Sequence, residues 1–166
     1  MKAAPLSTTA LIRIPVGVVV ERRKAHSLWA EFLWRPVCVL VGKASAAPWT
    51  PIAADGEAAT FYAGEAVIEL YRSETANYRD NLASGSPSVW VVLRPVASEP
   101  AFEIVTVTAD PSEGEAMTDA GSDLVEIVTM PAAIIEQIGS FIAEHHVERP
   151  FAKREREKTA SKEIAK

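Results

Sequence analysis

The feature that most constrains the fold of this chain is a run near its start in which apolar residues recur at every second position. The apolar positions are Ile12, Ile14, Val16, Val18 and Val20, and the residues between them are Arg13, Pro15, Gly17, Val19 and Glu21. Period two over this length predicts a β-strand with one buried face. Pro15 has no N–H to donate to a neighbouring strand, so we expect this strand to lie at a sheet edge near its start. Such an edge is able to pair with a second copy, and the sequence leaves the oligomeric state open.

Three segments that follow differ in pattern. Residues 22–32 break the alternation, and residues 34–41 are apolar at nearly every position, which predicts a strand covered on both faces. Residues 42–60 are small, proline-rich and aperiodic, so we expect a long loop there. Residues 62–72 alternate again and predict another strand.

The second half of the chain contains the clearest hairpin. Residues 89–94 and 102–108 are apolar and β-branched, and a segment with a proline at each end separates them. Residues 124–129 predict a last strand.

Three helices are predicted from their end signals. Ser73 is placed to cap a short helix over residues 74–83. Asp110, followed by Pro111 and Glu113, has the spacing of a capping box that opens a second short helix. Pro131 opens the longest helix, whose apolar stripe comprises Ile134, Ile135, Ile138, Phe141, Ile142 and His145.

Strands joined mostly by short turns predict an α+β fold, in a chain of 166 residues that suits one compact domain. We expect residues 1–150 to form a single sheet-rich domain: a mainly antiparallel curled sheet or partial barrel, with two short helices and a packed C-terminal helix. Residues 151–166 are expected to form a flexible basic tail. From Val147 onward seven Lys or Arg stand against four Asp or Glu, whereas the whole chain has a net charge of −5.

The composition excludes several classes of protein. An acidic chain with a pI near 5.3 lacks the basic surplus of a non-specific nucleic-acid binder, and no apolar run reaches the roughly 18 residues that span a membrane. Cys38 is the one cysteine, so neither an internal disulfide nor a thiolate zinc cage can form. The first residues do not make a signal peptide, because Arg13 and Pro15 interrupt the apolar segment. We therefore expect a cytoplasmic protein.

No catalytic pattern emerges from the residue types and their spacing. Phosphate-binding glycine loops and a Gly-x-Ser-x-Gly elbow are absent. Cys38 lies in an apolar strand, where a thiol is usually a core side chain. His145 and His146 are adjacent on a helix and so point about 100° apart, which is poor geometry for one metal ion. Glu65 and Glu69 are interpreted as a solvated strand edge. We expect no catalytic residues, no metal and no cofactor. The residues favour a protein that is not an enzyme over a hydrolase or transferase of unknown type, which is the weaker alternative.

One recurring pattern suggests a binding surface, because arginine stands near aromatic residues at several strand ends. Arginine recognises carboxylate or phosphate with two prongs, and both residue types are enriched at interaction hot spots. The alternative is that each arginine lies separately over the sheet or pairs with a glutamate. The candidate interaction patch comprises Arg22, Arg35, Arg72, Arg94, Trp34, Trp90 and Tyr71.

Several separated segments together resemble a known bacterial family. They are residues 14–23, Trp34-Arg-Pro36, 69–72, 78–82, 88–94 and 141–154. The family is of unknown function and is often encoded beside molybdenum-dependent formate dehydrogenase genes. Some members carry the label molybdopterin-guanine dinucleotide biosynthesis protein. The resemblance supplies no catalytic residues.

Two hypotheses follow from the resemblance and the candidate patch. In the first, the chain is a non-catalytic accessory or assembly protein whose partner is a formate dehydrogenase subunit or a cofactor-maturation factor. In the second, it binds an anionic pterin or nucleotide through Arg22, Arg35, Arg72 and Arg94, including a role in molybdopterin-guanine dinucleotide biosynthesis.

Overall fold

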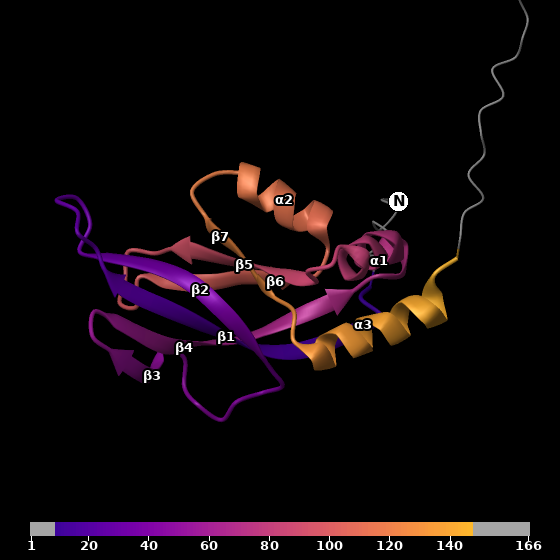
Figure 1. Cartoon of the computed structure of the whole chain (residues 1–166), viewed down its shortest axis with the longest axis horizontal. Helices are drawn as coiled ribbons and strands as arrows, with labels where there is room; N and C mark the ends of the chain where they lie inside the picture. Colours follow the sequence, from indigo (N-terminus) through magenta and orange to yellow (C-terminus); the bar gives the residue numbers. More distant parts are fainter. Residues whose placement is uncertain (1–8, 148–166) are drawn as a thin grey trace, which may run out of the picture.

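Two antiparallel sheets face each other in the computed structural model, which describes residues 9–147. The first sheet has the order β2-β1-β4-β3 and the second the order β6-β5-β7. The sheets are not joined into a closed barrel, although β4 contacts β6 and β2 contacts β7 along the two seams. The prediction of an α+β domain with a partial barrel is confirmed (Figure 1).

The elements follow one another in a simple order along the chain. They are β1 (Ile12–Lys24), β2 (Phe32–Val41), β3 (Thr50–Asp55), β4 (Ala58–Leu70), a 3₁₀ helix η1 (Arg72–Glu74), α1 (Thr75–Ala83), β5 (Ser88–Pro95), β6 (Phe102–Thr108), α2 (Pro111–Asp119), β7 (Leu124–Thr129) and α3 (Ala132–His145). The predicted tail at residues 151–166 lies outside the described residues.

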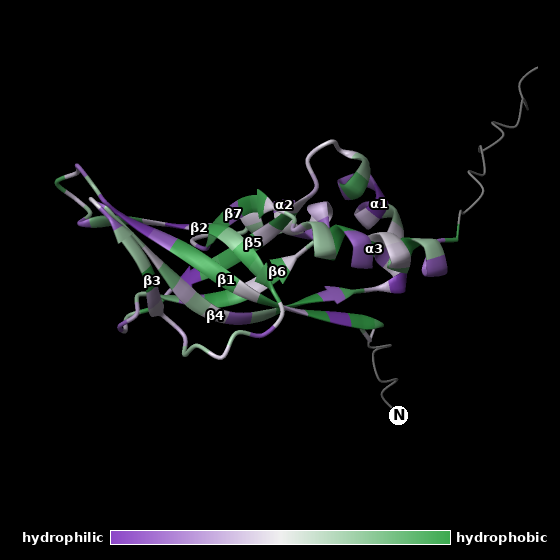
Figure 2. Cartoon of the chain, turned by 60° about the horizontal axis from the view of Figure 1, so that its bottom comes forward, coloured by the Kyte–Doolittle hydropathy of each residue, from purple (hydrophilic) through white to green (hydrophobic). Residues whose placement is uncertain are grey.

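The core lies between the sheets and is made of alternate residues from their facing sides. Ile14, Val16, Val18 and Val20 supply the period-two face of β1, and all four are nearly inaccessible to solvent. The second sheet contributes the inward residues of β5 in the same way. Figure 2 shows the hydrophobic colour concentrated along the strands. The predicted period-two inner face is therefore present, but Gly17 and Val19 between its residues are buried as well, so the middle of β1 is covered on both faces.

The position of β1 agrees with the predicted edge only at the start of the strand. Ile12–Pro15 pair with β4 alone, because the β1–β2 ladder begins only at Val16, opposite Val41. At Pro15 the Gly42 N–H donates to the Pro15 carbonyl at 2.9 Å. From Val16 onward β1 lies between β2 and β4, so the predicted self-pairing over residues 12–20 is not available there.

The segment predicted as a long loop contains an additional strand. β3 pairs with the first part of β4 through a two-residue turn, in which Gly56 has a φ of +58°. A positive φ at the first central position is what a type II′ hairpin turn requires, and glycine adopts it without strain. The residues of β3 are almost all exposed, so no buried face imposes an alternating pattern on them.

β2 also departs from its prediction. Its apolar residues are covered on both faces only in the middle, because Leu33, Leu40 and Val41 are 61%, 45% and 47% exposed. An outer strand of a sandwich has fewer neighbours than a central one, which explains the exposure.

α1 and α3 lie at one end of the sandwich, opposite the β1–β2 and β3–β4 hairpins, and α2 lies over the second sheet (Figure 1). α1 packs on α3 through Tyr78 and Phe141, whose ring centroids lie 6.1 Å apart. The backbone N–H of Tyr71 donates to the Tyr78 hydroxyl at 3.0 Å, and burial raises the pKa of Tyr78 to about 12. Ser73 does not cap α1: it lies within η1, and its hydroxyl donates to Glu74.

The predicted start of α2 is confirmed with one change. The Asp110 carboxylate accepts from the N–H groups of Ser112 and Glu113, and Pro111 takes the first helical position. The Glu113 carboxylate does not accept from the Asp110 N–H, as it would in a capping box. It accepts instead from the Thr108 hydroxyl, which in turn accepts from the Asp110 N–H.

Candidate functional site

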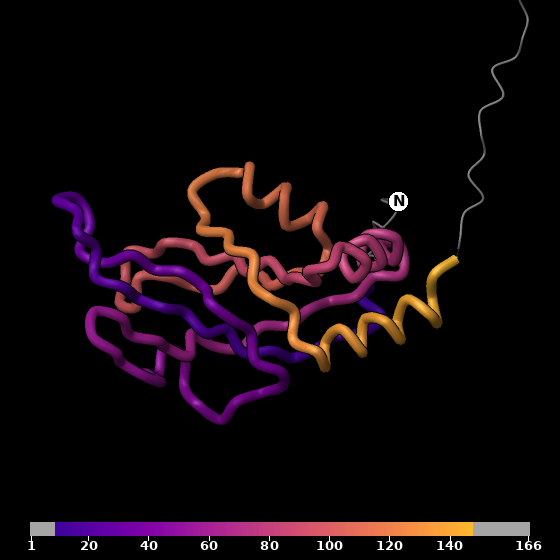
Figure 3. The backbone as a smooth tube through the Cα atoms, viewed as in Figure 1, coloured from indigo at the N-terminus to yellow at the C-terminus, as the bar shows by residue number. Residues whose placement is uncertain are grey.

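The end opposite α1 and α3 carries the most exposed large apolar side chains among residues 9–147. The β1–β2 connection, residues 25–31, projects beyond the sheets (Figure 3). Leu28 is 98% exposed and Trp29 is 93% exposed at its tip. Two adjacent large apolar side chains held outward on a projecting hairpin make this tip a candidate interaction site.

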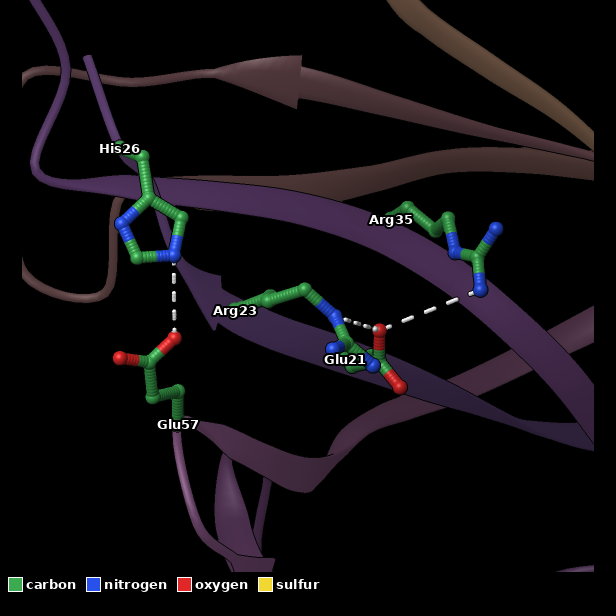
Figure 4. A network of polar contacts seen from close by, with 5 residues as sticks. All are labelled: Glu21, Arg23, His26, Arg35 and Glu57. Atoms are coloured by element: carbon green, nitrogen blue, oxygen red, sulfur yellow. Dashed lines mark hydrogen bonds and ion pairs between the residues drawn. The ribbon is translucent and has the colours of Figure 1, made fainter.

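Backbone and side-chain contacts hold this tip in place. The N–H of Ala25 donates to the Glu31 carbonyl at 3.0 Å, and the N–H of Lys24 donates to the Glu57 carbonyl at the same distance. His26 Nε2 lies 3.2 Å from the Glu57 carboxylate (Figure 4). Glu57 belongs to the β3–β4 turn, so the two hairpins support each other.

A second polar contact stiffens the stem of the hairpin on its outer face. The Glu21 carboxylate lies 3.4 Å from Arg23 and 3.9 Å from Arg35, its neighbour across the β1–β2 ladder (Figure 4). The two arginines are largely exposed, so the pairs contribute little to overall stability. Their effect is to fix the orientation of the charges beside the tip.

On the inner face of the same stem, Arg22 is surrounded by aromatic rings. Its guanidinium carbon lies 4.4 Å from the ring centre of Phe32, 5.2 Å from that of Phe61 and 5.7 Å from that of Trp34. These distances are within the range of cation–π attraction. Among residues 9–147 Arg22 has no ion pair and no hydrogen-bond acceptor for its side chain.

The rings around Arg22 continue across both sheets. Trp34 lies about 6 Å from the ring centres of Trp49, Phe61 and Phe102, and Phe102 comes from β6 of the second sheet. Trp49 has a φ of +64°, which is uncommon for a residue with a large side chain and costs on the order of 1 kcal/mol. We call Phe32, Trp34, Trp49, Phe61 and Phe102 the aromatic cluster, and the cluster with Arg22 and the tip the hairpin end.

Of the seven residues in the predicted patch, the structure brings two together. Arg22 and Trp34 are direct cross-strand partners on the inner face of the first sheet. Arg35 is on the opposite face of that sheet, beside Glu21.

The other four lie elsewhere. Arg94 pairs with Asp123 at 3.1 Å, which raises its pKa, and Trp90 is buried beneath α2. Arg72 is exposed in η1, and the Tyr71 hydroxyl donates to Glu69.

The residues judged to be structural occupy ordinary positions. His145 packs against the Phe141 ring. His146 Nε2 lies 3.1 Å from Arg79 and its Nδ1 3.0 Å from the Thr75 hydroxyl; because arginine can only donate, Nε2 accepts and Nδ1 carries the proton. Burial raises the pKa of the Cys38 thiol. Within residues 9–147 no group of three or more His, Cys, Asp or Glu is arranged to hold a metal ion.

Sequence reasoning missed the tip itself. Residues 22–32 were seen only as a break in the alternation, although Leu28-Trp29 stands there as an apolar pair in a polar segment. An apolar pair in a connection between strands was the available signal, because connections run over the surface and their apolar residues are usually exposed.

Comparison with known proteins identifies a family. Neither a curated protein nor a solved structure gives a significant match. None of the helices among residues 9–147 combines the length and hydropathy that a bilayer crossing requires. A family model described as "Protein of unknown function (DUF3305)" matches residues 15–155, and the chain therefore belongs to this family of unknown function.

Proposed function

We propose that this chain is a non-catalytic accessory protein that binds a partner protein through the hairpin end. The observation that carries the proposal is the exposure of Leu28 and Trp29, at 98% and 93%, on a tip that is held in place by its own contacts. A tryptophan side chain has only two torsions, so it loses little conformational freedom when it enters a pocket, and tryptophan is among the most frequent hot-spot residues.

The identity of the partner comes from the resemblance. Genes of similar proteins stand beside those of molybdenum-dependent formate dehydrogenases, so the proposed partner is a subunit of such an enzyme or a factor that matures its cofactor. Arg22 and the aromatic cluster lie at the base of the same hairpin and supply a second contact region for the partner.

Replacement of both tip residues by serine is expected to abolish this interaction. We expect Leu28→Ser/Trp29→Ser to recover at least tenfold less dehydrogenase subunit or maturation factor than wild type in a pull-down from native cells, since one hot-spot side chain contributes about 2 kcal/mol or more. Ile127→Ser is the matched control, because Ile127 is 59% exposed on β7. Equal recovery with both variants, or no such protein with wild type, contradicts the proposal.

One observation favours a second candidate, an anionic pterin or nucleotide at Arg22. The guanidinium has aromatic rings for stacking and no acid partner among the described residues. Planar anionic ligands need both features, a stacking surface and a positive charge.

Thermal-shift measurements with GTP and with a pterin distinguish this candidate. Wild type is expected to be stabilised at saturating ligand, and Arg22→Gln to lose the shift. Arg72→Gln, which removes an exposed arginine elsewhere, should keep it. A flat response with wild type eliminates the small-molecule hypothesis and leaves the tip prediction unaffected.

A further inference from the structure

A groove of about 320 Å³ lies along the seam between the two sheets, nearer the helices than the hairpin end. β4 lines one side with Glu65, Val67 and Glu69, β6 lines the other with residues 104–108, and Glu113 of α2 stands at the rim. This volume is at the lower end of the range for ligand sites in proteins.

Both strands that border the groove have unpaired backbone edges. β6 is an outer strand of its sheet and pairs only with β5. β3 covers β4 only as far as Tyr62, so from Ala63 to Leu70 the β4 backbone is paired with β1 alone in the described part of the chain. Edge strands of this kind accept an additional strand from another polypeptide.

The side chains around the groove determine which strand it would accept. Glu65 and Glu113 are exposed carboxylates that make no ion pair within residues 9–147. Glu69 is bound by Arg13 at 3.1 Å and by the Tyr71 hydroxyl. The pKa of Tyr71 is raised, first by its hydrogen bond to Glu69, then by burial and by the charges of Glu69 and Glu113. The groove therefore carries three carboxylates, Glu65, Glu69 and Glu113, and Arg13 pairs only with Glu69.

Between the carboxylates the lining is partly apolar. Val67 is 36% exposed, and Ile104 and Val105 are half-buried on the other side. Successive side chains of a strand bound in the groove point to opposite sides. One set therefore lies against the apolar lining, and the other set reaches the carboxylates.

We propose that this groove binds an extended segment of a partner protein in which lysine or arginine alternates with apolar residues, and that the segment pairs with the free edge of β6. Its basic side chains meet Glu65 and Glu113. Five residues, 104–108, give a ladder of about 17 Å at roughly 3.3 Å per residue. A second copy of this chain is disfavoured as the occupant, because its own groove would bring carboxylates against carboxylates.

The test uses the full chain and three fluorescent hexapeptides. The first alternates arginine or lysine with valine. The second carries glutamate in place of the basic residues, and the third is the basic peptide with N-methylated valines, which keeps the charge and removes ladder donors. Fluorescence polarisation is expected to show binding of the first peptide, and at least tenfold weaker binding of the other two. Equal binding of the N-methylated peptide overturns strand pairing.

Two sets of variants assign the binding to this groove. Glu65→Gln/Glu113→Gln is expected to weaken binding of the basic peptide at least tenfold. Asp80→Asn/Glu136→Gln makes the same change of charge at exposed positions elsewhere and should leave that binding unchanged. Equal effects of the two pairs mean that only net charge matters and overturn the site.

Two further outcomes name other occupants. If wild type does not bind but the full chain with Lys153, Arg154 and Arg156 changed to glutamine does, the chain's own basic residues compete for the groove and the partner proposal fails. If wild type dimerises in sedimentation and the basic peptide dissociates the dimer, a second copy is the occupant and the partner proposal fails. Neither readout involves Leu28 or Trp29, so this proposal and the proposed function fail separately.

Discussion

Replacement of Gly114 by alanine is expected to destabilise the protein by about 2–4 kcal/mol. Gly114 is buried in α2, and a Cβ atom there would lie 2.2–2.5 Å from three ring atoms of Trp90. Trp90 is 7% exposed between α2 and the second sheet, so it has no free direction in which to move. The helix must therefore shift away from β5, and that loss exceeds the gain of about 0.5–1 kcal/mol that alanine normally gives in a helix.

Urea unfolding measures the effect, and the chain contains a matched control. Gly139 lies within α3, and a Cβ atom there would meet only the end of Leu82 at 3.9 Å, an ordinary contact. Gly139→Ala should therefore be neutral or slightly stabilising, the opposite sign from Gly114→Ala. In a Trp90→Leu background the cost of Gly114→Ala should shrink, because the ring that causes the overlap is gone. A stable Gly114→Ala protein would show that α2 does not pack against Trp90 in this way.

Replacement of Asn81 by leucine is expected to cost about 3 kcal/mol or more. The Asn81 side chain is 3% exposed and makes three hydrogen bonds. Its Nδ2 donates to the carbonyls of Ser88 and Ala109, each at 2.8 Å, and its Oδ1 accepts from the Ser88 N–H at 3.0 Å. Leucine has the same branched shape and number of side-chain heavy atoms, but it leaves these backbone groups without a partner in a buried place.

Asn81→Asp separates the hydrogen bonds from packing. The carboxylate keeps the acceptor for Ser88 but points negative oxygen at two carbonyls, so at neutral pH we expect a loss at least as large as that of leucine. Protonation restores one donor, so the deficit relative to wild type should decrease as the pH falls. Asp80→Asn is the control, because Asp80 is exposed on the same helix. If Asn81→Leu unfolds at the wild-type urea concentration, the amide does not hold α1 to β5.

Much of the fold was predictable because the local signals in the sequence agree with the burial of the same residues in the folded chain. The period-two run in β1 predicted the inner face, and Asp110 with Pro111 predicted the start of α2, since caps depend on a few adjacent residues. The errors lie where that agreement is absent. β3 has no buried face to produce a pattern, although Asp55-Gly56 is a recognised hairpin signal.

The hairpin end was only partly predictable. The arginine and aromatic residues near strand ends could be recognised in the sequence. Which face of the sheet each side chain lies on depends on the strand register. The register shifts between Val19 and Val20 in the β1–β2 ladder and between Val18 and Val19 in the β1–β4 ladder. A one-residue shift moves a side chain to the other face of a sheet. This is why Arg22 faces the aromatic cluster while Arg35, aligned with Glu21, faces outward.

The two sheets are built from consecutive halves of the chain, and this has a consequence for synthesis. The first sheet is complete once Leu70 has been made, because β1 pairs with β4 from Ile12 opposite Leu70 onward. The strands that cover its inner face begin only at Ser88. The apolar side of β1 therefore emerges from the ribosome before anything exists to shield it, and such surfaces attract chaperones and aggregate readily. Rapid translation through residues 71–95 shortens the time for which that face stays open.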